Sequence, residues 1–163
     1  MKAYLDNNVV CSIVTNDDLQ ESGALTCLLI AYDESKIELI ISELTLDEIT
    51  ACPEPIRTTL KRMFLLLVKV PVVRWDVLTA IRSGGDKHTW FNAPSISNES
   101  EYEALLALGL DIMDARHVFV ATKRSCNVFL TCDKNVLKRT NEIANLCDIL
   151  VQTPSAFVER HRW

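Results

Sequence analysis

The sequence contains no hydrophobic run long enough to cross a bilayer. Its longest apolar run, residues 63–68, is closed by Lys69, whereas a membrane-spanning helix needs about 20 apolar residues. We also expect no secretory signal, because Asp6 precedes any apolar segment in the first residues. We therefore expect a cytoplasmic protein with no membrane association.

Close cysteine pairs are missing too. The six cysteines include no C-x-x-C pair, which argues against a structural zinc site. Most of them fall inside apolar runs, where free cysteines are usually buried. We therefore favour buried, reduced thiols as the interpretation of the cysteines, which are Cys11, Cys27, Cys52, Cys126, Cys132 and Cys147.

An excess of basic residues, which marks many nucleic-acid-binding domains, is absent. The formal net charge is −5, which taken alone argues mildly against nucleic-acid binding. The charges are unevenly placed, however. Residues 17–54 hold ten acids and one base, and residues 55–87 hold seven bases and two acids. We expect one acidic and one basic side, and a bound divalent cation would offset part of the negative charge.

No internal repeat or low-complexity tract interrupts the chain. With 48% hydrophobic and 24% charged residues, the 163-residue sequence has the composition of a globular protein with a substantial core. We therefore expect a single domain over residues 1–163. Only residues 84–100 read as a long loop.

Strand-like and helix-like segments alternate along the sequence. Apolar runs predict strands at 2–6, 36–42, 70–74, 127–131 and near 148–151. Helical spacing and capping signals predict helices at about 8–15, 18–34, 44–52, 56–69, 75–83, 101–108, 111–125 and 133–142, and after Pro154. This alternation predicts an α/β protein, a three-layer α/β/α sandwich with a central, mostly parallel sheet.

Acidic residues flank the predicted strands. Ligands of open parallel sheets collect outside the carboxyl ends of the strands. Asp6 ends the first strand, and Asp133 follows the fourth, with Thr131 on the same side of the pleat. Glu48 lies on the helix entered from the second strand. Asp114 lies in the first turn of the helix that leads into the fourth strand, so its end of that helix faces the same edge.

Four carboxylates at one edge need a counter-charge. Like charges raise one another's pKa, so the group cannot stay fully ionised without a cation. Oxygen ligands suit Mg²⁺ or Mn²⁺. Such a cation polarises a phosphoryl oxygen and lowers the pKa of a bound water, which is chemistry suited to phosphodiester hydrolysis.

Four segments, taken in order, resemble the PIN-domain ribonucleases. They are "AYLDNN", a strand ending in Asp; "ISELTLDEI", a helix with an inner Glu; "DIMDARHVFVAT", a helix opening with Asp; and "VFLTCD", a strand ending in Thr-x-Asp. The resemblance covers nearly the whole chain, and it rests on the ordered set rather than on any one segment. It implies that the metal-binding and catalytic acids are Asp6, Glu48, Asp114 and Asp133, supported by Thr131 and by Asn7, which stands where the family often has Thr or Ser.

The resemblance also carries expectations about activity and partners. It implies an Mg²⁺- or Mn²⁺-dependent endoribonuclease that leaves 5′-phosphate and 3′-hydroxyl ends on RNA. Many members of the family are toxins paired with a small antitoxin protein, and many are homodimers. The chain is longer than the compact toxin members, and we place the extra length in a loop insertion at about 84–100.

Each acid also has a purely structural interpretation. Asp6 and Asp133 could simply cap the helices that follow them. Thr45 and Glu48 have the spacing of a capping box. Glu43 and Asp47 are neighbouring alternatives for the site.

The helix near residue 111 offers two acids for one role. Asp111 fits the N-cap of this helix, which puts Asp114 at the third helical position and next to the apolar stripe. We therefore assign the site role to Asp114 rather than to Asp111.

Several other polar residues have two interpretations. His117 lies on the same helix face as Asp114, but we expect it to be a packed, structural histidine. Arg116 and Lys134 are candidates for substrate contacts, and a surface ion pair or a solvated helix face is the alternative. Trp90 and Phe91 suit stacking on RNA bases, but we favour a loop pinned to the body by its own side chains.

Two rival functions remain open. A haloacid dehalogenase-like phosphatase needs a second Asp two positions after its aspartate nucleophile, and Asn8 stands there. A PIN-like module that binds RNA or protein without catalysis would keep the fold and not the activity.

Overall fold

Five parallel strands form the centre of the molecule. The computed structural model describes residues 1–15, 18–66, 70–73 and 100–163. The strands within them run in the order β3-β2-β1-β4-β5, and every pairing is parallel. They are β1 (Lys2–Leu5), β2 (Glu38–Ser42), β3 (Val72–Val73), β4 (Val128–Leu130) and β5 (Leu150–Gln152).

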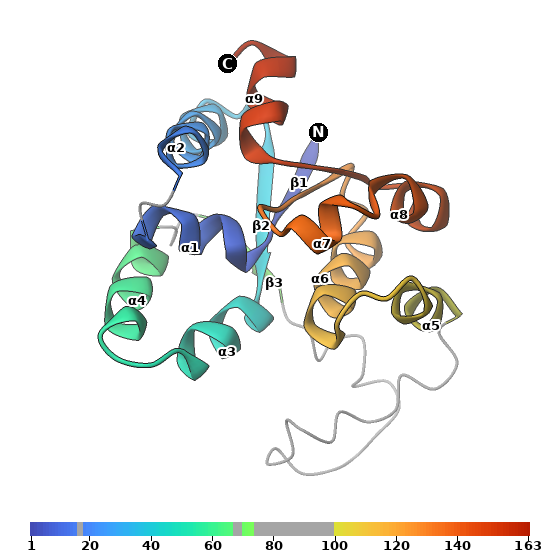
Figure 1. The fold of residues 1–163 in the computed structure, drawn as a ribbon. Helices are drawn as coiled ribbons and strands as arrows, with labels where there is room; N and C mark the ends of the chain where they lie inside the picture. The colour runs from blue at the N-terminus through green and yellow to red at the C-terminus, as the bar shows by residue number, and fades with distance from the viewer. Residues whose placement is uncertain (16–17, 67–69, 74–99) are drawn as a thin grey trace.

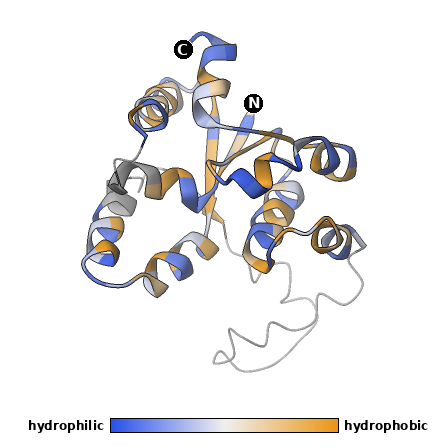
Figure 2. Cartoon of the chain, viewed as in Figure 1, coloured by the Kyte–Doolittle hydropathy of each residue, from blue (hydrophilic) through white to orange (hydrophobic). Residues whose placement is uncertain are grey.

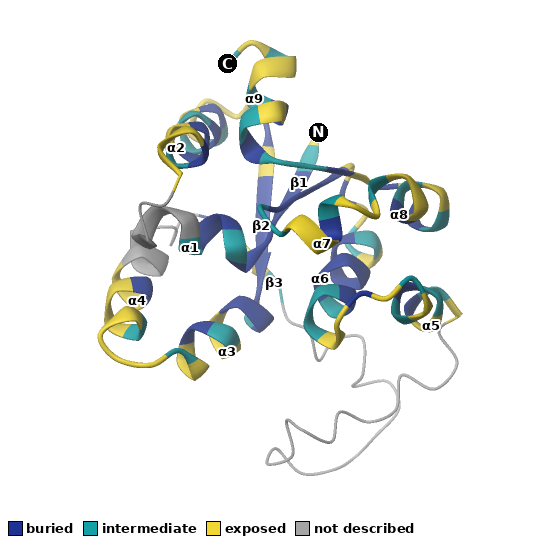
Figure 3. Ribbon diagram, in the orientation of Figure 1, coloured by how far each residue is buried: buried dark blue, intermediate teal, exposed yellow. Residues whose placement is uncertain are grey.

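Successive residues of the central strand face opposite cores. Tyr4 belongs to one hydrophobic cluster, whereas Ala3 and Leu5 belong to the other. This alternation is the period-2 geometry of a strand, and both faces are apolar because helices cover both sides of the sheet. Figure 3 shows most of β1 and most of β2 in the colour of buried residues.

The first core lies between the sheet and α5 (Ser100–Ala107), α6 (Ile112–Lys123) and α8 (Thr140–Cys147). Tyr4 and Phe129 stack within it, with ring centroids 5.4 Å apart and planes 10° from parallel. Tyr102 meets Phe119 edge-on at 5.7 Å. The first contact joins β1 to β4 and the second joins α5 to α6, within the core on the face that carries Tyr4.

The second core lies under α1 (Asn7–Thr15), α2 (Leu19–Asp33) and α9 (Pro154–His161). Phe157 of α9 is fully buried there with Leu25 and Leu28 of α2. The backbone N–H and the hydroxyl of Ser155 donate to the Glu21 carboxylate, which ties the start of α9 to α2. The two helix layers on opposite faces confirm the predicted α/β/α sandwich, as Figure 1 shows.

Two further helices extend from the second strand. These are α3 (Glu43–Ala51), with Ser42 as its N-cap, and α4 (Ile56–Leu66), which packs on α1 and α3. Figure 2 shows that the helices with described side chains alternate hydrophobic and hydrophilic residues along their length, as expected for helices that cover a core on one side only.

The predicted helix at 133–142 is wrong. The structure has two helices here, α7 (Lys134–Leu137) and α8, separated by a turn at Arg139, where φ is −106°. The Thr140 hydroxyl donates to the Leu137 carbonyl at 2.7 Å and stabilises that turn. The second helix then runs past the predicted end to Cys147, and Asp148 ends it in the left-handed conformation.

The other described helices lie within a few residues of their predicted positions. For α2, the Asp18 side chain accepts hydrogen bonds from the backbone N–H groups of Gln20 and Glu21, as an N-cap does. The predicted helix at 75–83 and the predicted loop at 84–100 lie outside the described residues, except that Ser100 begins α5. None of the described helices combines the length and the apolar composition needed to span a bilayer.

Candidate functional site

Asp6 lies where the central strand ends. Its backbone N–H donates to the carbonyl of Leu130 at the end of β4, 3.0 Å away. Asp6 is only 2% exposed, yet its carboxylate is well supplied with donors. It accepts hydrogen bonds from the backbone N–H of Asn7 at 2.8 Å, the Thr131 hydroxyl at 2.7 Å and the Asn8 amide at 3.3 Å. Two adjacent strand ends therefore hold this acid in place.

Thr131 connects Asp6 to Asp133. While its hydroxyl donates to Asp6, the same oxygen accepts the backbone N–H of Asp133 at 2.9 Å. Asp133 in turn is the N-cap of α7, and its Oδ1 accepts from the N–H groups of Asn135 at 2.6 Å and Val136 at 3.3 Å. The capping interpretation of Asp133 thus holds for one oxygen, and Oδ2 accepts no hydrogen bond from the described residues.

Asp114 lies in the first turn of α6. Asp111 is the N-cap of that helix, because its side chain accepts from the backbone N–H groups of Met113 and Asp114. The predicted capping role of Asp111 is confirmed, and the site role of Asp114 stays a prediction. The Asp114 carboxylate itself is half-buried and forms no hydrogen bond or ion pair with the described residues.

The surroundings of Asp114 raise the pKa of its carboxyl group. Burial raises this pKa from its ordinary value of 3.8 to about 7, and the negative charges of nearby acids add to the effect. In order of size, these acids are Asp111, Asp6 and Asp133. The pKa of Asp6 is raised as well, chiefly by burial. Three of the four predicted acids therefore lie within electrostatic range of one another at the carboxyl edge of the sheet.

Glu48 contacts His117, and the ring of His117 also lies near Asp6. Its Oε2 lies 2.9 Å from Nε2 of His117, and Nδ1 of that ring lies 4.0 Å from Oδ1 of Asp6. Burial lowers the pKa of His117, but the hydrogen bond to Glu48 and the charges of Asp6 and Glu48 outweigh it, so the net direction is upward. His117 is packed in the core as predicted, at 1% exposure, but its contact with Glu48 was not foreseen.

The capping-box interpretation of Glu48 is wrong. Helix α3 begins at Glu43 behind Ser42, so Thr45 and Glu48 both lie inside the helix rather than across its start. The Thr45 hydroxyl is buried and has no hydrogen-bond partner among the described residues. Of the three acids considered on this helix, which are Glu43, Asp47 and Glu48, Glu48 is the one that contacts His117.

The two basic residues predicted to contact substrate lie on α7 and α6. Lys134 is exposed in the first turn of α7, next to Asp133 in the sequence. Arg116 on α6 is partly buried, and its Nη1 lies 3.8 Å from the sulfur of Met113. Neither the position of Lys134 nor the contact of Arg116 shows binding to a phosphate. Trp90 and Phe91 lie outside the described residues.

The acids do not form a ready-made metal site. Across the part of the chain that the structure describes, no group of three or more His, Cys, Asp or Glu side chains is arranged to hold an ion. The chemistry of the set still fits a hard cation, since Asp6, Glu48, Asp114 and Asp133 offer carboxylate oxygens. Burial is the largest cause of the raised pKa of Asp114, and the negative charges of nearby acids, which also raise it, would favour added positive charge.

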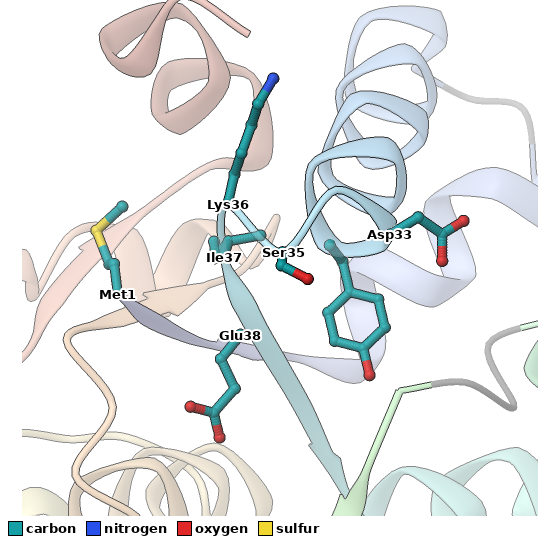
Figure 4. Close-up of a pocket in the computed structure, with 7 residues that line it drawn as sticks. Met1, Asp33, Ser35, Lys36, Ile37 and Glu38 are labelled. Carbon is teal, nitrogen blue, oxygen red and sulfur yellow. The ribbon is translucent and has the colours of Figure 1, made fainter.

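A pocket of about 530 Å³ lies at the amino-terminal ends of the strands, whereas Asp6 lies at their carboxyl ends. Figure 4 shows it at the start of β1 and β2, below the last turn of α2. Its lining contains none of the predicted site residues and consists of Met1, Tyr32, Asp33, Ser35, Lys36, Ile37 and Glu38. Because its acids and its lysine stand at an open surface, we do not associate this pocket with the chemistry of Asp6.

Comparison with known proteins establishes the fold. No family model and no curated protein matches the chain. A solved structure, that of VapBC2 from Rickettsia felis bound to a DNA fragment from their promoter, aligns with 94% of this chain and 98% of that chain, with a TM-score of 0.57 and 12% sequence identity. The fold is PIN-like. At this identity the likeness extends to the fold alone, and the PIN-like fold places Asp6 at the carboxyl edge of its central strand.

Proposed function

We propose that this protein is a metal-dependent endoribonuclease of the PIN type, acting on RNA in the cytoplasm. The observation that carries the proposal is the position of Asp6. It is a buried carboxylate fixed at the carboxyl edge of the central strand, with Asp133 linked to it through Thr131 and Asp114 within electrostatic range. A purely structural acid would not need two further carboxylates at its side.

The residues that would hold Mg²⁺ or Mn²⁺ are Asp6, Asp114 and Asp133, with Glu48 completing the set. When bound, the cation would supply Lewis acidity at a phosphoryl oxygen and lower the pKa of water, so that hydrolysis needs no side-chain nucleophile. The RNA phosphates would meet Lys134 and Arg116 at the rim of the acids.

The chain's own hydrogen bonds determine how much each acid can move. Asp6 is held by Asn7 and Thr131, and one oxygen of Asp133 is held by the start of α7. These two acids are therefore preorganised. Asp114 has no such partner among the described residues and stays adjustable, so we assign to it the adaptation of the site to the ion.

A small antitoxin protein is the partner we propose, with the chain itself forming a homodimer. The resemblance to the PIN-domain family supports both, because many of its members are inhibited toxins and many are dimers. The structural likeness to VapBC2 supports the antitoxin partner, and the homodimer rests on the family resemblance alone.

Cleavage of a mixed single-stranded RNA pool by the purified protein tests the proposal. The reaction is run with Mn²⁺, with Mg²⁺ and with EDTA. The variants are Asp6→Asn and Asp133→Asn, with Asp148→Asn as the matched control, since Asp148 is exposed at the amino end of β5. We expect metal-dependent cleavage that both site variants lose and the control keeps. Cleavage that survives in EDTA, or in Asp6→Asn, would contradict the proposal.

A non-catalytic binding module is the second candidate. It is favoured by one observation: Glu48 is paired with His117 and Asp133 caps α7, so both acids already have structural roles. The phosphatase alternative is weaker, because Asn8 occupies the position of its second Asp and donates its amide to Asp6. An acyl-phosphate trapped on Asp6 would support the phosphatase, and RNA binding without cleavage in Mn²⁺ would support the module.

A further inference from the structure

A buried polar chain joins four elements of the fold beside Asp6. The Tyr4 hydroxyl on β1 lies 2.6 Å from the Ser42 hydroxyl on β2 and 2.6 Å from Nδ1 of His117 on α6. Nε2 of the same ring lies 2.9 Å from Glu48 on α3. Tyr4, Ser42 and His117 are almost completely buried, and the Glu48 side chain is 28% exposed. This series of hydrogen-bonded side chains therefore runs from the core outward and ends on the Glu48 carboxylate, which solvent can reach.

The direction of the bond to Glu48 follows from the chemistry of the two groups. An ionised carboxylate can only accept, so Nε2 of His117 carries a proton and donates it. On the other side of the ring, the Tyr4 hydroxyl donates its proton to Ser42. The contact between Tyr4 and Nδ1 therefore has Nδ1–H of His117 donating to the Tyr4 oxygen.

Tyr4 limits the orientations open to the imidazole. Its ring stacks on Phe129 and its hydroxyl stays protonated, because burial raises the pKa of Tyr4 well above 10. Rotating the His117 ring away would leave buried polar groups of Tyr4 and Ser42 with fewer hydrogen-bond partners, which is unfavourable because water cannot replace the lost bonds. The His117 ring is thus held at one end by the core and holds Glu48 at the other. It also spans the space between Glu48 and Asp6, 4.0 Å from the latter.

We propose that His117 is a positioning residue of the candidate metal site, which orients Glu48 beside Asp6 through its Nε2–H bond while Tyr4 fixes the ring from behind. This inference rests on the proposed nuclease function and extends it to residues that touch neither ion nor RNA. Partners of this kind typically change metal affinity about 10- to 100-fold when removed.

Two substitutions at His117 separate positioning from packing. The amide of Gln reaches about as far as Nε2, so His117→Gln can still donate to Glu48. The amide of Asn reaches about as far as Nδ1, so His117→Asn can contact only Tyr4. Both remove the ring from the same buried place, and a purely structural role predicts similar behaviour for the two.

The measurement is Mn²⁺ affinity by calorimetry, together with the Mn²⁺ concentration that half-activates RNA cleavage. We expect His117→Asn to weaken both about 10-fold or more, and His117→Gln to recover most of that loss. The double variant Glu48→Gln/His117→Asn should bind no more weakly than Glu48→Gln alone, since His117 acts only through Glu48. Thermal unfolding of each variant confirms that it is folded at the assay temperature.

Each contrary result has a distinct meaning. If wild type binds Mn²⁺ and cleaves RNA, but His117→Asn and His117→Gln do the same with equal affinity, His117 only packs and the nuclease proposal stands. If folded wild type neither binds Mn²⁺ nor cleaves, the nuclease proposal fails and the positioning role with it. Should His117→Asn not fold, Tyr4→Phe decides: it keeps the stacked ring and removes the hydroxyl, and unchanged Mn²⁺ affinity overturns the inference.

Discussion

Replacing Asp114 with Asn should stabilise the metal-free protein at alkaline pH. In the folded chain the pKa of Asp114 is raised from its ordinary value of 3.8 to about 7 by burial and by its acidic neighbours. The folded state therefore disfavours the charged form. Wild type keeps its full stability below about pH 4, loses it as the pH rises through about 7, and stays at the lower level above that. Asn carries no charge and removes this dependence.

The magnitude follows from the separation of the two pKa values. At about 1.4 kcal/mol for each pH unit, the interval from 3.8 to about 7 gives an upper limit of about 4 kcal/mol. Because the Asp114 carboxyl is only half-buried, solvent screening reduces this, and we expect about 1–2 kcal/mol. For a protein of this size that is a rise in Tm of roughly 2–8 °C at pH 8.

Urea unfolding followed by circular dichroism measures this difference. Wild type, Asp114→Asn and the exposed control Asp148→Asn are compared at pH 4 and pH 8, in EDTA. Other groups that titrate in both proteins largely cancel from the difference. The reasoning is refuted if Asp114→Asn is no more stable than wild type at pH 8, or if the gain is equally large at pH 4. In saturating Mn²⁺, wild type should become more stable than Asp114→Asn, because only wild type has the full set of carboxylates to bind the ion.

Three further predictions concern single side chains. Thr131→Val keeps the shape of Thr131 but removes the hydroxyl shared by Asp6 and Asp133, so urea unfolding should show a loss of about 1–3 kcal/mol and Mn²⁺ titration a weaker site. Phe157→Ala should cost about 3–5 kcal/mol of stability by opening a cavity under α9, while the Mn²⁺ affinity of the protein that remains folded stays unchanged. Lys134→Ala should raise KM for RNA about threefold or more at low salt, with kcat unchanged, and the effect should shrink as salt screens the phosphate contact.

The fold class could be predicted because the alternation of strands and helices follows from local patterns, whereas the order of the strands in the sheet was not predicted. Apolar strands separated by helices leave few arrangements other than a parallel sheet covered on both faces. The break at Arg139 could not be seen this way. Val136 and Ile143 are both buried, and their spacing of seven residues is that of an unbroken helix face, so the turn between them leaves no mark in the apolar pattern.

The site was predictable only in part, for a related reason. Topology brings Asp6, Asp114 and Asp133 to one edge, and the sequence shows which residues stand at strand and helix ends. Contacts between side chains on distant elements could not be predicted in this way. His117 and Glu48 are 69 positions apart, and the period of each helix gives the face of a residue but not the side chain that it meets.

Mn²⁺ binding by calorimetry to wild type, Asp6→Asn and Asp148→Asn tests the central claim most directly, since it needs no knowledge of the RNA target. We predict that wild type and Asp148→Asn bind Mn²⁺ with the same affinity and that Asp6→Asn loses the binding. No binding to folded wild type, or equal binding by Asp6→Asn, would mean that the acids at this edge of the sheet are helix caps and core polar groups rather than a metal site.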